Sequence, residues 1–235
     1  MAAIAWLPPL GKYVPGKVVA LLGAMAMLRR VGVQAAVAAS VVLMLDALAV
    51  LTGLIVATPT LLHPAIVARY GPLVYTAVAC VLVGSVVLHP HVFVRLLNTL
   101  LKKMKRSTIP HVPSVIEYLP TIALAFAQWL FAGLALWCMC RAFVPGLAIA
   151  TLGPLIAAAA GAMTISYLVL ISPGGVGVRE GIYLFILPLL LGTGSGPAVA
   201  LIVPAMRLWQ TIIEVVLASL GAAILKSDPQ LSGKT

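Results

Sequence analysis

The chain contains repeated apolar runs that are each about as long as a lipid bilayer is thick. Five long runs extend over residues 36–57, 73–88, 121–140, 147–171 and 198–225. A helix needs about 20 apolar residues, at ~1.5 Å rise each, to cross a hydrocarbon core of ~30 Å. The runs lack the alternation of apolar and polar residues that a transmembrane β-strand requires. The sequence therefore predicts an all-α, polytopic transmembrane helix bundle, with residues 1–235 forming a single transmembrane domain.

The composition and the placement of charge agree with a membrane protein. Hydrophobic residues make up 63% of the chain and charged residues 9%, whereas a soluble domain carries about 25% charged residues. The net charge of +10 raises the question of nucleic acid. However, five basic residues crowd into one loop, as is typical of cytoplasmic segments beside anionic lipid: Arg95, Lys102, Lys103, Lys105 and Arg106. We therefore expect a multi-pass protein of the plasma (inner) membrane, in contact with lipids and not with nucleic acid.

The same basic loop also has a helical pattern. Apolar residues recur at helical spacing between Val92 and Met104, opposite Arg95, Asn98 and the lysines. This pattern predicts an amphipathic helix that lies in the headgroup plane and binds the anionic cytoplasmic leaflet through residues 93–106.

Neither cysteine nor histidine indicates a metal or cofactor site. Cys80, Cys138 and Cys140 fall inside the predicted spans, so we expect buried small residues rather than a disulfide framework. The four histidines lie in loops near prolines, where residues of the membrane interface are common. We predict no metal ligand, no cofactor and no catalytic residue.

Two further apolar segments are too short to span a bilayer. Residues 18–28 follow a Pro15-Gly16-Lys17 break, and residues 181–191 follow the break from Pro173 to Gly177. Broken or re-entrant half-helices of this kind survive at membrane depth where protein or a cavity surrounds them. Glycines there would leave N–H groups free at the start of the half-helix, which together with Arg179 would favour an anion such as phosphate. Whether residues 181–191 cross or re-enter, and hence the side of the C-terminus, stays open.

Charged residues inside the predicted spans indicate a polar interior. A charge at bilayer depth costs about 2.5–3.5 kcal/mol on insertion scales, so it usually faces a cavity or a partner. The charged residues at this depth are Asp46, Arg179, Glu180, Arg207 and Glu214. We expect them to line a cavity, with Asp46 or Glu214 paired to Arg207 or Arg179. The alternative is a set of ion pairs that only fixes helix packing.

Several separated motifs resemble one membrane-protein family. The motifs are Gly11 to Val18, Asp46-Ala47-Leu48, the glycine-rich stretch from Ser172 to Gly181, and the polar stripe from Arg207 to Glu214. Together they are similar to the lysylphosphatidylglycerol synthase transmembrane-region family, also described as flippase-like membrane proteins. The resemblance covers nearly the whole chain, and its most specific part is the glycine-rich Arg-Glu motif.

The resemblance implies a lipid flippase or translocase that moves or presents an anionic phospholipid or a polyprenyl-linked lipid. The implied lipid-binding residues are Pro15, Gly16, Lys17, Asp46, Pro173, Gly174, Gly175, Gly177, Arg179, Glu180, Arg207 and Glu214. Two alternatives stay open. One is a non-catalytic membrane partner of a separately encoded lipid-modifying enzyme. The other is a membrane-embedded lipid transferase, with Glu180 or Glu214 as general base.

The chain departs from the family pattern at both ends. Family members usually have about two more helices before the first Pro-Gly motif, so we expect the chain to lack them. A ten-residue tail follows the last predicted span, where lipid-aminoacylating relatives carry a transferase domain. We therefore do not expect this chain to aminoacylate lipid alone.

Overall fold

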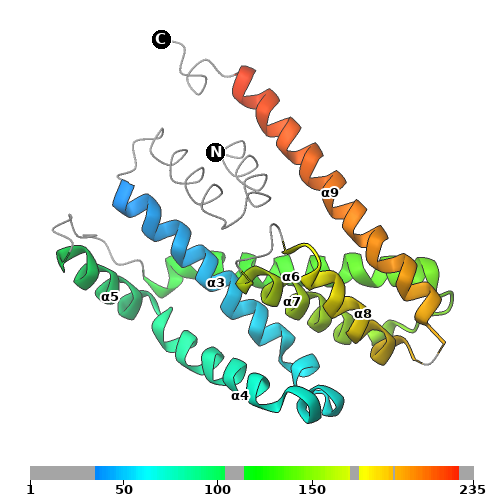
Figure 1. Cartoon of the computed structure of the whole chain (residues 1–235). Helices are drawn as coiled ribbons and strands as arrows, with labels where there is room; N and C mark the ends of the chain where they lie inside the picture. The colour runs from blue at the N-terminus through cyan, green and yellow to red at the C-terminus, as the bar shows by residue number, and fades with distance from the viewer. Residues whose placement is uncertain (1–34, 104–113, 170–174, 193, 228–235) are drawn as a thin grey trace.

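The computed structural model describes residues 35–103, 114–169, 175–192 and 194–227, and these residues form helices without any strand (Figure 1). In chain order the elements are α3 (Ala35–Leu61), α4 (Pro64–Val87), α5 (Pro90–Lys103), α6 (Val115–Phe143), the 3₁₀ turn η2 (Ile149–Thr151), α7 (Leu152–Leu168), α8 (Val178–Leu191) and α9 (Gly196–Ser227). The first Pro-Gly motif, with Pro15, Gly16 and Lys17, and the apolar segment 18–28 lie outside the described residues, as do Pro173 and Gly174.

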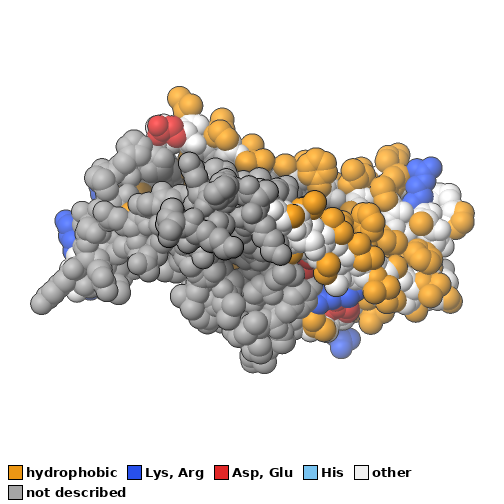
Figure 2. Space-filling model, turned by 90° about the horizontal axis from the view of Figure 1, so that it is seen from above, with side chains coloured by type: hydrophobic (Ala, Val, Ile, Leu, Met, Phe, Trp, Pro, Cys, Tyr) orange, Lys and Arg blue, Asp and Glu red, His pale blue; other side chains and the backbone are white. Residues whose placement is uncertain are grey.

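Five helices are long and apolar enough to cross a membrane, and this confirms the predicted polytopic bundle. The candidate spans are Ala39–Leu61, Pro64–Val87, Ile116–Phe143, Ile149–Leu168 and Gly196–Gly221. Large apolar side chains such as Leu73, Leu82 and Leu124 are mostly exposed on the outside of the bundle. Figure 2 shows apolar side chains over much of the described surface on one face. Lipid tails are the solvent that suits such a surface.

The connection between α3 and α4 is much shorter than the sequence indicates. The prolines between residues 58 and 72 predict a loop, but only Leu62 and His63 separate the two helices. Pro64 occupies the first helical position of α4, where a missing N–H costs nothing. Pro72 lies inside α4, just after a bend at Tyr70 where the backbone leaves helical geometry. Membrane helices tolerate such prolines because neighbouring groups satisfy the freed carbonyls.

Helix α7 forms the centre of the bundle, because small residues let its neighbours approach closely. Its alanines from Ala157 to Ala160 are all buried. Gly53 of α3 lies against Thr164, and Gly133 of α6 lies against the backbone of Ile156. Close approach of this kind, rather than burial away from water, drives helix association inside a bilayer.

Helix α8 turns back toward the end of the bundle at which α7 begins. Ile186 packs in one cluster with Ile66, and Leu61 and Leu190 join that cluster from α3 and α8. The Thr60 hydroxyl donates to the Pro154 carbonyl at 3.5 Å, so α7 also starts beside the α3–α4 turn. The run 181–191 therefore returns rather than continuing α7, and α9 then runs toward the opposite end (Figure 1).

The basic segment forms a separate helix, α5, as the sequence predicts. Arg95, Lys102 and Lys103 are exposed, whereas Val94 is buried and Phe93 packs near Leu88. The expectation for the cysteines is wrong in part: Cys140 is buried, but Cys80 and Cys138 are exposed on the outside of their helices. A small, weakly polar thiol is tolerated at a surface that faces lipid.

Candidate functional site

The glycine-rich break between α7 and α8 is built from backbone conformations that favour glycine. Gly175 and Gly177 have φ values of +71° and +84°, where other L-residues are strained. Gly175 also lies tightly against α7, since an added Cβ would sit 2.8 Å from the Cβ of Ser166. The chain can therefore fold back along α7 at this point because both positions are glycine.

The first turn of α8 is capped by its own acid. The Gly177 N–H donates to Glu180 Oε2 at 2.7 Å, so this N–H is not free, although the sequence suggests free glycine N–H groups. The Gly181 N–H makes the first helical bond, to the Gly177 carbonyl. The N–H groups of residues 178–180 thus precede the first intrahelical bond and form the positive end of the helix dipole.

Glu180 also contacts two arginines on different helices. Its Oε1 atom lies 3.6 Å from Arg207 Nη1 on α9 and 3.9 Å from Arg179 Nη2. The three side chains are largely buried, with 21%, 21% and 10% of their surface exposed for Glu180, Arg207 and Arg179 respectively. Two guanidinium groups thus lie against one carboxylate, beside the positive end of the α8 dipole. We call these three residues the arginine cluster.

The arginine cluster lies deep in the bundle. Arg207 is eleven residues after the first residue of α9, or roughly 17 Å along its axis, and Arg179 is twelve residues before the last residue of α8, or roughly 18 Å. Both helix ends lie at the end of the bundle that carries the α3–α4 turn. The cluster is therefore about half a hydrocarbon thickness from that end.

Buried polar atoms without a partner lie within one turn of the cluster. Tyr183, one turn after Arg179, is 2% exposed, and its hydroxyl has no hydrogen-bond partner among the described residues. The Gln210 Oε1 atom, one turn after Arg207, is also buried and has no hydrogen-bond partner among the described residues. Buried polar groups are nearly always paired, so these atoms mark a place where a ligand or water can complete the hydrogen bonding.

Asp46 meets a residue that the sequence interpretation omits. Its carboxylate is hydrogen-bonded to Tyr167, in the last turn of α7 and directly before the break. Among the acids, Glu180 is the one shown in contact with both arginines. Glu214 lies seven residues after Arg207 on the same face of α9 and is partly buried. The structure thus brings Arg179, Glu180 and Arg207 together, and places Asp46 beside the break.

Tyr167 and Tyr183 are polar residues near the break that the motifs do not reveal. Tyr183 could have been found from its spacing, because it lies four residues after Arg179 and so one turn along α8. Tyr167 has no such signal, since its contact with Asp46 joins residues far apart in the chain.

These features define a multi-pass helical membrane protein with a broken helix and a charged cluster inside the bundle. The chain belongs to the family described as the lysylphosphatidylglycerol synthase TM region, whose model matches residues 10–217. No curated protein and no solved structure matches the chain.

Proposed function

We propose that this protein is a lipid translocase of the plasma membrane, which moves or presents an anionic phospholipid or a polyprenyl-linked lipid through the bundle. The observation that carries the proposal is the arginine cluster beside the start of α8. It combines two guanidinium groups with the N-terminal end of a helix at a depth where water is scarce.

The phosphate of a lipid headgroup suits this arrangement. A guanidinium offers two parallel N–H groups that match two phosphate oxygens, and such charge-assisted bonds are roughly twice as strong as neutral ones. The contacts of Glu180 with the arginines are 3.6 and 3.9 Å long, which is longer than a tight ion pair. A phosphate can therefore compete with Glu180 for the arginines.

The two guanidinium groups favour an anion over a cation as the transported group. A cationic headgroup would meet two guanidinium groups at close range, and like charges repel strongly where water is scarce. The Tyr183 hydroxyl, one turn away, has no partner among the described residues and adds a donor for a phosphate oxygen.

The test is a lipid-movement assay with the purified full chain in proteoliposomes. Fluorescent phosphatidylglycerol is reconstituted, and a membrane-impermeant quencher reports the fraction that changes leaflet. We expect Arg179→Ala and Arg207→Ala to slow this movement strongly, and Arg179→Lys to slow it less, because a lysine keeps the charge but lacks the fork.

Arg69→Ala is the matched control. Arg69 lies on α4 near the α3–α4 turn, stacked over the Tyr70 ring at 5.7 Å, and thus outside the arginine cluster. It should leave lipid movement unchanged. Full lipid movement in a well-inserted Arg179→Ala protein would contradict the proposal and would leave the cluster with a packing role only.

A further inference from the structure

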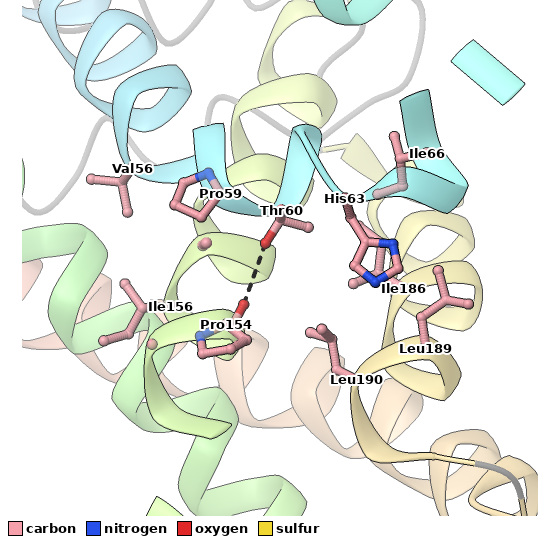
Figure 3. Close-up of a pocket in the computed structure, with 12 residues that line it drawn as sticks. Val56, Pro59, Thr60, His63, Ile66, Pro154, Ile156, Ile186, Leu189 and Leu190 are labelled. Carbon is pink, nitrogen blue, oxygen red and sulfur yellow. Dashed lines mark hydrogen bonds between the residues drawn. The ribbon is translucent and has the colours of Figure 1, made fainter. Parts of the chain in front are cut away.

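A cavity of about 440 Å³ lies beside the α3–α4 turn, and none of the arginine-cluster residues lines it. Figure 3 shows the residues that line this cavity. Its walls come from the end of α3, the start of α4, the start of α7 and the second half of α8. The volume falls within the range of small-molecule sites, which is about 300–1,000 Å³.

The walls of the cavity are apolar. Val56 of α3 and Ile156 of α7 line one side, and Ile186, Leu189 and Leu190 line the α8 side. The Thr60 hydroxyl is already bonded to the Pro154 carbonyl, so it offers no free donor (Figure 3). An occupant must therefore be largely hydrocarbon, because a polar one would lose its hydrogen bonds to water.

His63 supplies one polar group at the level of the turn. Its Nδ1 atom accepts a hydrogen bond from the Ala65 N–H at 3.3 Å, so the ring proton lies on Nε2. The ring extends toward the space between α3 and α8 (Figure 3). Among the described residues, no acceptor is found for this Nε2–H. The cavity thus presents a donor near the end of the bundle and hydrocarbon below it, which is the polarity of a lipid.

The cavity and the arginine cluster lie along one face of α8. Ile186 and Leu190 follow Arg179 by seven and eleven residues, and these spacings repeat one side of a helix. Leu190 is roughly 17 Å from Arg179 along the helix axis. A lipid that moves along this face would pass from the cluster to the cavity.

We propose that this cavity holds one hydrocarbon chain of a membrane lipid, with the His63 Nε2–H donating to an oxygen where the chain joins the polar part of the lipid. The lipid occupies the cavity when its polar part lies at the end of the bundle that carries the α3–α4 turn. The proposal rests on the proposed function for the identity of the lipid, whose anionic group is the one that the arginine cluster holds.

The test is photolabelling of the full chain in phosphatidylcholine vesicles that contain phosphatidylglycerol with a diazirine on one acyl chain. Labelled peptides are identified by mass spectrometry after irradiation. We expect the label on the second half of α8 and on the end of α3. Excess unlabelled phosphatidylglycerol or excess polyprenyl phosphate then shows which lipid competes for the cavity.

Two variants fill the cavity from different helices. Gly153 lines the cavity and has open space where a Cβ would be, so Gly153→Leu can add side-chain volume there. Leu189→Trp adds volume from a partly exposed position on α8. Each should lower labelling several-fold, and His63→Phe should lower it as well. Gly196→Leu is the control, because Gly196 also begins a helix with open space around it but does not line the cavity.

Unchanged labelling in both filled variants would overturn the proposal, as would labelling spread evenly over the exposed face of α4. Arg179→Ala separates this proposal from the proposed function. If Arg179→Ala moves lipid at full rate while the wild-type cavity is still labelled and blocked by Gly153→Leu, the translocation site is wrong and the cavity proposal stands. If the cavity is not labelled while Arg179→Ala stops lipid movement, the cavity proposal is wrong and the proposed function stands.

Discussion

Arg207 Nη1 lies 3.6 Å from Glu180 Oε1, and this contact ties the middle of α9 to the first turn of α8. The same carboxylate caps α8 through the Gly177 N–H. One side chain therefore fixes the start of the half-helix and its position against α9. A ligand that displaces Glu180 from the arginines would loosen both, so binding at the cluster and movement of α8 are linked by this carboxylate.

The two roles of Glu180 can be separated by two substitutions. Glu180→Gln keeps an oxygen for the Gly177 N–H but removes the charge that balances the arginines, whereas Glu180→Ala removes both. We expect Glu180→Ala to cost about 0.5–2 kcal/mol more than Glu180→Gln, which is the usual loss for a helix cap. Thermal unfolding in detergent measures the difference. Equal melting temperatures for the two variants would show that the cap contributes nothing.

A charge swap tests the pair itself. Arg207→Glu alone places two acids together and should destabilise the protein, and Glu180→Arg alone places three arginines together. The double variant should recover part of the loss, with an interaction energy of about 0.5–3 kcal/mol from the double-mutant cycle. Strictly additive losses would mean that the two side chains are not coupled. The readout is again thermal unfolding, with Arg69→Ala as an unrelated control.

The glycines of the break should differ in their tolerance of alanine. Gly175→Ala combines a positive φ with a clash against Ser166, whereas Gly177→Ala meets only the positive φ, which costs about 1–2 kcal/mol. Gly181→Ala lies within α8 with open space around it and should stabilise the helix by about 0.5–1 kcal/mol. From most to least stable, the expected order is Gly181→Ala, wild type, Gly177→Ala and Gly175→Ala. Melting temperatures in any other order would contradict the geometry of the break.

Much of the fold follows from the sequence because the bilayer leaves few choices. Apolar length predicts the five spans, and the glycines from Gly174 to Gly177 predict the break that separates α7 from α8. The extent of α4 was predicted poorly, since Pro64 and Pro72 read as loop residues although one begins the helix and the other lies within it. Proline stops helices in water more reliably than in lipid.

The sequence predicts which charged residues belong to the candidate site better than it predicts their contacts. The presence of Arg179 and Arg207 inside the bundle follows from intramembrane charge, but their contact with Glu180 depends on how α8 turns back against α9. The spacing of residues shows which side chains share a face of one helix, but not which face of a neighbouring helix they meet. For the same reason the bond between Asp46 and Tyr167, and the cavity at His63, became visible only in the structure.

Helix α5 should bind anionic membranes through its exposed basic residues. Arg95, Lys102 and Lys103 each contribute about 1 kcal/mol near an anionic surface, and salt screens this attraction. The peptide 90–103 should therefore bind phosphatidylglycerol vesicles at low salt and lose much of that binding at high salt. A peptide with all three basic residues changed to glutamine should bind neutral and anionic vesicles alike. Equal binding of the natural peptide to both kinds of vesicle would remove the electrostatic part of this expectation.

The contact between Gly53 and Thr164 should behave as a coupled pair in the packing of α3 against α7. An added Cβ at Gly53 would collide with the Thr164 hydroxyl, which is buried and has no hydrogen-bond partner among the described residues. Gly53→Ala alone should therefore destabilise the protein by about 1–3 kcal/mol, the usual cost of overpacking. Thr164→Ala removes the colliding hydroxyl but leaves the Trp129 ring, whose Cζ2 atom would lie 2.8 Å from the added Cβ. The double variant should therefore be more stable than Gly53→Ala alone, although the relief is only partial. Gly133→Ala provides the contrast, because its Cβ would meet the backbone of Ile156 and no side-chain change there can relieve it. Thermal unfolding of the four variants decides the matter, and a Gly53→Ala protein as stable as wild type would mean that α3 and α7 do not pack this closely.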